Sequence, residues 1–163
     1  MRFVLFDRIL DFEKGSRVVL LKNVTRSEDF FIDHFPGFPI VPGSILLGAF
    51  EQGGAILIAA SSDFSVRPVL NKVTRANFRN FVLPGDQVKI RLEFDGVSKS
   101  RITAAAEVEG KNVANARLDY SLEKPNENQE ALEACNRLKA FYALLNSSPV
   151  SKAWDLWGKE SLG

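Results

Sequence analysis

The chain has 163 residues, of which 45% are hydrophobic and 25% are charged, a composition that fits one globular domain with a substantial core. Its net charge of +1 provides no general attraction to nucleic acid or to an anionic membrane surface, so we expect neither as a partner. One cysteine and one histidine make a poor set of metal ligands, so we predict no metal site and no disulfide within the chain.

The first 20 residues predict no secretory leader. They carry Asp7, Asp11 and Glu13 and lack a basic start, an apolar block and a small-residue cleavage site. We therefore expect a cytoplasmic protein.

Residues 17–23, with four consecutive apolar side chains, predict a strand that leads through the short apolar stretch 30–32 into a loop.

This loop, at residues 34–43, carries the histidine of the chain and reads HFPGFPIVPG, with three prolines and two glycines. Imidazole ordinarily titrates near neutral pH, and a rigid loop can hold such a base in a fixed direction. The apolar run that follows predicts a helix from about residue 43 or 44 to residue 60, whose first N–H groups favour developing negative charge nearby. An ordinary surface turn is the alternative, but a base, backbone donors and rigidity in one segment favour a functional site.

The predicted helix is too short and too polar to span a bilayer comfortably, so we expect a buried helix of a soluble protein and no membrane span. Glu51 is the one ionisable residue between positions 44 and 60. A buried carboxylate there should have a raised pKa, which suits a general acid. A residue at the rim of the site or at a dimer contact is the alternative for Glu51.

The sequence after the helix predicts antiparallel strands. Alternation is loose over residues 69–81 and clean over 87–94, and it continues over 101–109 and 113–122. Turn dipeptides separate the last three segments, which predicts a meander.

A polar linker at residues 124–128 precedes a helical tail, in which apolar residues recur at helical spacing from Leu132 to Leu145. We expect the apolar stripe of this tail to lie on the sheet, with contact to a partner chain as the alternative. A short final segment holds Trp154 and Trp157. The predicted division is a domain at residues 1–123 and a helical extension at residues 124–163.

Several motifs together resemble the signature of the hot-dog-fold (3R)-hydroxyacyl-acyl carrier protein dehydratases of fatty acid synthesis. They are His34-Phe35-Pro36-Gly37, Pro39-Ile40, Pro42-Gly43 and Gln52, with further similarity over roughly residues 5 to 123. The resemblance implies an α+β fold in which a curved antiparallel sheet wraps around a long central helix, here with an added C-terminal helical tail. It also implies no cofactor, because the substrate is carried on the phosphopantetheine of acyl carrier protein or of coenzyme A.

The resemblance further implies at least a homodimer, with each site built from both subunits. His34 would remove the proton alpha to the thioester carbonyl, and the N–H of Gly43 would polarise that carbonyl. An acid on the helix of the other subunit would help the β-hydroxyl group to leave, which gives a trans-2-enoyl thioester. The residues that we expect to contact substrate are Phe35, Gly37, Phe38, Pro42, Gly48 and Gln52.

The sequence departs from the family at the acid. The corresponding position, fourteen residues after His34, is Gly48, which has no side chain. Glu51 lies about one turn further along and about 60° around the helix. We therefore keep three outcomes: a dehydratase with a relocated acid, a degenerate hot-dog subunit that pairs with an active homologue, and a non-catalytic protein that binds acyl thioesters. A thioesterase is a lesser alternative.

Three basic residues are candidates for docking the acidic carrier protein. Lys72, Arg75 and Arg79 recur at near-alternating spacing in one predicted strand region. An ordinary solvated strand face is the alternative for these residues.

Overall fold

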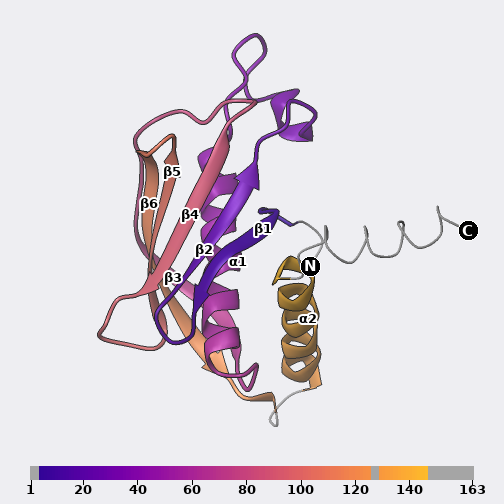
Figure 1. The fold of residues 1–163 in the computed structure, drawn as a ribbon, viewed down its shortest axis with the longest axis vertical. Coiled ribbons are helices and arrows are strands. Elements are labelled where there is room, and N and C mark those ends of the chain that lie inside the picture. Colours follow the sequence, from indigo (N-terminus) through magenta and orange to yellow (C-terminus); the bar gives the residue numbers. More distant parts are fainter. Residues whose placement is uncertain (1–3, 126–128, 147–163) are drawn as a thin grey trace, which may run out of the picture.

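The computed structural model describes residues 4–125 and 129–146, which form a curved antiparallel sheet, a long helix against it and a second helix beside both (Figure 1). The elements are β1 (Arg8–Glu13), β2 (Arg17–Asn23), the 3₁₀ helix η1 (Asp29–Phe31), α1 (Gly43–Ser61), β3 (Arg67–Phe78), β4 (Gln87–Phe94), β5 (Arg101–Val108), β6 (Lys111–Glu123) and α2 (Gln129–Asn146). The final segment with Trp154 and Trp157 lies outside the described residues, as does most of the predicted linker.

The sheet has six strands in the order β1-β2-β4-β5-β6-β3, and every neighbouring pair is antiparallel. Strands β4, β5 and β6 form the predicted meander. Strand β3 precedes them in the chain but pairs with β6, on the far side of the meander, so it forms one edge of the sheet. The sequence pattern did not indicate this crossover.

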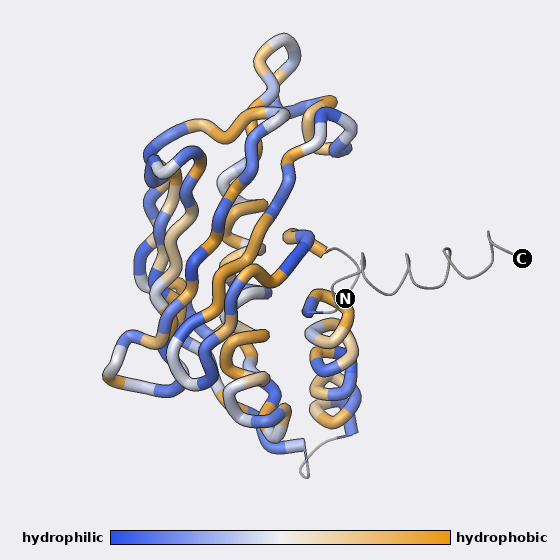
Figure 2. The backbone as a smooth tube through the Cα atoms, viewed as in Figure 1, coloured by the Kyte–Doolittle hydropathy of each residue, from blue (hydrophilic) through white to orange (hydrophobic). Residues whose placement is uncertain are grey.

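Helix α1 is the core of the fold. Phe50, Ile56 and Leu57 are fully buried, and they lie under the inward residues of the strands, among them Leu20, Ile90, Ile102 and Leu118. Figure 2 shows hydrophobic residues along α1 and along the strands of the sheet. The prediction that this helix is too short and too polar for a membrane span was wrong, because Gly43–Ser61 has the length and hydropathy of one. However, 67% of that stretch is buried inside the protein, as expected for a core helix.

Close approach between α1 and the sheet depends on glycine. A Cβ atom at Gly53 would lie 2.7 Å from the side chains of both Leu20 and Leu92. Because these leucines come from β2 and β4 and are fully buried, a side chain at position 53 would have to displace their packed ends.

Helix α2 packs against α1 and β1 rather than lying on the sheet alone. Its Phe141 ring lies 5.8 Å from the Phe6 ring, and its Tyr142 ring lies 5.5 Å from the Phe12 ring. Residues Ala131, Cys135, Leu138 and Leu145 are buried on the same helix. Most of the predicted apolar stripe is therefore covered within the chain, but Leu132, at its start, is exposed. The division into a domain and an extension stays a prediction.

Candidate functional site

The histidine loop is folded tightly onto itself. The amide of His34 donates to Phe30 O at 3.0 Å, and the amide of Ile40 donates to His34 O at 3.2 Å. Between them, Phe35 and Phe38 exchange two backbone hydrogen bonds around Gly37, whose φ of 81° favours glycine. The backbone thus fixes the direction of the His34 side chain from both ends of the loop.

The His34 ring is held in one tautomer. Its Nδ1 atom lies 3.0 Å from the carbonyl oxygen of Ile40. Because a carbonyl oxygen only accepts hydrogen bonds, Nδ1 carries the proton of the neutral ring and Nε2 keeps its lone pair. The Phe35 ring stacks on the imidazole with centroids 4.3 Å apart. His34 is therefore a base whose lone pair lies on Nε2.

The N-terminus of α1 follows this base closely in the chain. The helix begins at Gly43, and the preceding Pro42 makes no side-chain cap for its first turn. A Cβ atom at Gly43 would lie 3.1 Å from the Phe78 ring, so the backbone and this ring are in close contact. The amide of Val41 donates to Val82 O at 2.8 Å and ties the loop to the segment after β3. Uncapped amides at a helix start stabilise an anion.

A hollow of about 530 Å³ contains the predicted acid. It is lined by Ser44, Leu47, Gly48 and Glu51 of α1 and by residues 67–70 of β3. Burial raises the pKa of Glu51. The Tyr120 hydroxyl donates to the backbone oxygen of Glu51 at 2.8 Å and so anchors this turn of the helix. His34 is not among the residues that line this hollow.

The N-terminal segment contacts the helix where the family places its acid. A Cβ atom at Gly48 would lie 2.7 Å from Leu5 Cδ1, so Leu5 takes up part of the space that a longer side chain would need. The amide of Leu5 also donates to Gln52 Oε1 at 3.2 Å. Sequence reasoning missed the role of this segment, because nothing in the local pattern of residues 4–7 places it over α1.

None of the three basic candidates lines the hollow beside Glu51. Lys72 pairs across the ladder with Asp119, and Arg75 pairs with Arg117, which places both on the face of the sheet opposite α1. Arg79 follows the end of β3, where its amide donates to Val113 O at 2.8 Å. All three side chains are exposed.

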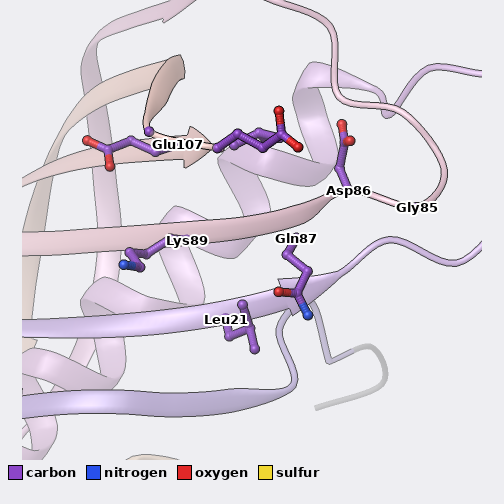
Figure 3. Close-up of a pocket in the computed structure, with 9 residues that line it drawn as sticks. Leu21, Gly85, Asp86, Gln87, Lys89 and Glu107 are labelled. Atoms are coloured by element: carbon purple, nitrogen blue, oxygen red, sulfur yellow. The ribbon is translucent and has the colours of Figure 1, made fainter.

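Another hollow, of about 380 Å³, contains none of the predicted site residues (Figure 3). It lies on the outer face at one end of β2, β4 and β5, where Lys89 and Glu107 are neighbours across the ladder. Asp86, at its rim, accepts a hydrogen bond from the amide of Leu83 at 2.8 Å, as a turn residue does. Among residues 4–125 and 129–146, no three His, Cys, Asp or Glu side chains gather in a metal-binding arrangement.

Comparison with known proteins shows the family of this chain. A family model described as a FabA-like domain matches residues 1–117. The 3-hydroxyacyl-[acyl-carrier-protein] dehydratase FabZ of Desulforamulus reducens is 43% identical over 121 residues, which cover 74% of this chain and 80% of that protein. The chain belongs to the FabA-like family of 3-hydroxyacyl-[acyl-carrier-protein] dehydratases.

Solved structures confirm the predicted hot-dog fold of this family member. A hot-dog-like protein from Thermanaerovibrio acidaminovorans is similar with a TM-score of 0.58 and 14% identity, over 73% of this chain and 89% of that one. A chain of the dehydratase heterocomplex ApeI:P from Xenorhabdus doucetiae is similar with a TM-score of 0.56 and 15% identity, over 69% of this chain and 95% of that one. At these identities the likeness concerns the fold alone.

Proposed function

We propose that the protein is a dehydratase that removes water from a (3R)-3-hydroxyacyl thioester and forms a trans-2-enoyl thioester, in fatty acid synthesis or a related acyl-chain synthesis. The observation that carries the proposal is the His34 ring, which is fixed by Ile40 with Nε2 available as a base, close in the chain to the start of α1. Family membership supports the same reaction. The substrate is carried by acyl carrier protein or coenzyme A, and the enzyme works in the cytoplasm without a cofactor.

The proposed reaction uses two side chains, a base and an acid, and one backbone N–H group. His34 Nε2 takes the proton from C2 of the thioester and leaves an enolate, whose electrons then form the C2=C3 double bond as the C3–O bond breaks. The N–H of Gly43 donates to the thioester oxygen while it carries enolate charge; losing such a donor typically costs about a hundredfold to a thousandfold in rate. A carboxylic acid protonates the departing hydroxyl group, which leaves as water, and water returns the proton from His34 to that acid.

Glu51 is the proposed acid. Burial raises its pKa, which keeps a larger share of the carboxyl group protonated near neutral pH, as proton donation requires. The hollow beside it is large enough for water, so a water molecule can relay the proton across the gap left by Gly48.

A dimer formed through β3 would bring the two groups together. Residues 67–70, beside Glu51, lie at one end of β3, and Phe78, which contacts Gly43, ends the strand at the other end. Antiparallel pairing of β3 with the β3 of a second copy places the beginning of one strand beside the end of the other. The histidine loop of one chain would then face the Glu51 hollow of its partner.

The second candidate is a subunit that lacks its own acid and pairs with a homologous chain, or one that only binds acyl thioesters. The specific observation in its favour is Gly48, where Leu5 contacts the position that a family acid would occupy. A fold neighbour belongs to a dehydratase heterocomplex, which gives a precedent for paired chains in this fold. A thioesterase remains a lesser alternative.

Hydration of a crotonyl carrier thioester by the purified chain separates these candidates. Activity of the chain alone, at a rate proportional to its concentration, supports a complete dehydratase. A rate at background over several acyl lengths, restored by a second hot-dog chain, would support the paired subunit, and a background rate with thioester binding would support the acyl-binding protein.

A further inference from the structure

One buried charge near the histidine loop takes no part in the proposed chemistry. Lys22 and Gln52 are the two polar or charged residues that are buried in the described part of the chain. The Lys22 side chain is 6% exposed, and its Nζ atom lies 2.7 Å from Glu28 Oε1, whose side chain is 27% exposed. Lys22 comes from β2, two residues after the fully buried Leu20, so it points toward the core.

A buried ion pair of this kind is weak evidence for added stability. Removing an ammonium group from water is costly, and apolar residues of similar size often serve a core equally well. The location of the pair suggests a different use, because Glu28 immediately precedes η1 and the turn that carries His34.

Short backbone hydrogen bonds connect the ion pair to the base. The Phe31 amide donates to Glu28 O at 3.0 Å, and the His34 amide donates to Phe30 O at 3.0 Å. The Phe31 side chain is buried in the main core. Glu28 thus lies at the start of a backbone turn, hydrogen-bonded through η1, that ends at His34.

We propose that the Lys22–Glu28 ion pair is a positioning device for His34. By holding the start of η1 against β2, it keeps the imidazole in the orientation in which Nδ1 donates to Ile40 O and Nε2 faces the substrate. Its effect on activity rests on the proposed dehydratase function, whereas its effect on the ring does not.

The ring can be observed directly, because the chain contains one histidine. Long-range ¹H–¹⁵N NMR spectra at a pH where the ring is neutral report which nitrogen carries the proton. Glu28→Gln removes the charge with little change of shape, and Lys22→Met removes the buried ammonium group. The matched control is Lys14→Met, which breaks an exposed ion pair with Asp63, 2.6 Å long and with side chains 55% and 80% exposed. Lys22→Arg, which keeps the charge, tests rescue.

We expect the wild type, Lys14→Met and Lys22→Arg to show the Nδ1-protonated ring, and Glu28→Gln and Lys22→Met to show a mixture of tautomers. In Glu28→Gln and Lys22→Met, kcat should fall by about tenfold or more with KM nearly unchanged, because a misaligned base lowers the rate of the chemical step. A folded Glu28→Gln variant with the wild-type tautomer would overturn the proposal. If wild-type protein proves inactive, the dehydratase function fails, and the NMR comparison still decides the positioning claim.

Discussion

The Nδ1 atom of His34 lies 3.0 Å from the carbonyl oxygen of Ile40, which joins the base to the segment leading into α1. Two backbone bonds, from the His34 amide to Phe30 O and from the Ile40 amide to His34 O, close the same loop. The orientation of the base is therefore a property of the backbone path between residues 34 and 40, and changes in that path should affect catalysis more than folding.

Gly37→Ala tests this dependence on the loop path. Gly37 has a φ of 81°, and alanine in that conformation costs roughly 1–2 kcal/mol. Gly96→Ala, at a φ of 77° in the turn between β4 and β5, is the matched control because it imposes a similar strain away from the site. We expect similar losses in the free energy of unfolding, measured in urea, but a fall in kcat only for Gly37→Ala. Equal kcat values in the two variants would contradict the prediction.

Gly48→Glu should restore the acid at its family position. A Cβ atom there meets only the end of the Leu5 side chain, which can rotate, so we expect the variant to fold. If Glu51 is the working acid, Glu51→Gln should lower kcat by about a hundredfold to ten-thousandfold, and adding Gly48→Glu should recover much of that loss.

Gly48→Gln in the Glu51→Gln background is the control for this experiment, because it fills the same space without a proton to donate. A rescue by glutamine equal to that by glutamate would show that shape rather than acidity limits the reaction.

The raised pKa of Glu51 predicts a pH dependence of stability. The ordinary pKa of a glutamate in an unfolded chain is about 4.3, and burial raises the pKa of Glu51 above it in the folded protein. The ionised group therefore destabilises the folded state, and this penalty is absent below about pH 4 and grows as pH rises through the folded pKa. Glu51→Gln should have a higher Tm than the wild type at pH 8, with the difference shrinking toward pH 4. A pH-independent difference in thermal unfolding would contradict the shift.

Charge reversal tests the docking of an acidic carrier on the outer face. The double variant Arg75→Glu/Arg79→Glu should raise KM for the carrier-linked thioester several-fold, because rim charges steer association. Its KM for a small N-acetylcysteamine thioester should not change. Lys99→Glu, an exposed charge in the turn after β4, serves as the control. An unchanged carrier-linked KM in the double variant would remove the docking role.

Most strands of the sheet were predictable from the regular alternation of apolar residues in the sequence. The strands that were missed or poorly predicted have an irregular alternation. Strand β1 went unpredicted because its inward residues Ile9 and Phe12 lie three apart, and a register shift between Ile9 and Asp11 breaks the period of two. The loose alternation in β3 likewise reflects two register shifts, one on each side of the pair Lys72 and Val73. A bulge is defined by its partner strand, so a single-strand pattern does not reveal it.

The candidate site was predictable where its chemistry is local. The loop sequence placed a base next to a helix start, and α1 begins at Gly43 as the Pro-Gly dipeptide indicates. Contacts between distant segments were not predictable: Leu5 over Gly48, Tyr120 on Glu51 O and Ile40 O on His34 each depend on the folded path of the chain.

The most direct test of the account is the dehydration of a (3R)-3-hydroxybutyryl carrier thioester by the purified wild-type chain and by His34→Ala, with folding of both checked by circular dichroism. The account predicts a measurable wild-type rate that falls by at least about a hundredfold in His34→Ala. A wild-type rate that His34→Ala leaves unchanged, or a wild-type rate at background, would contradict it.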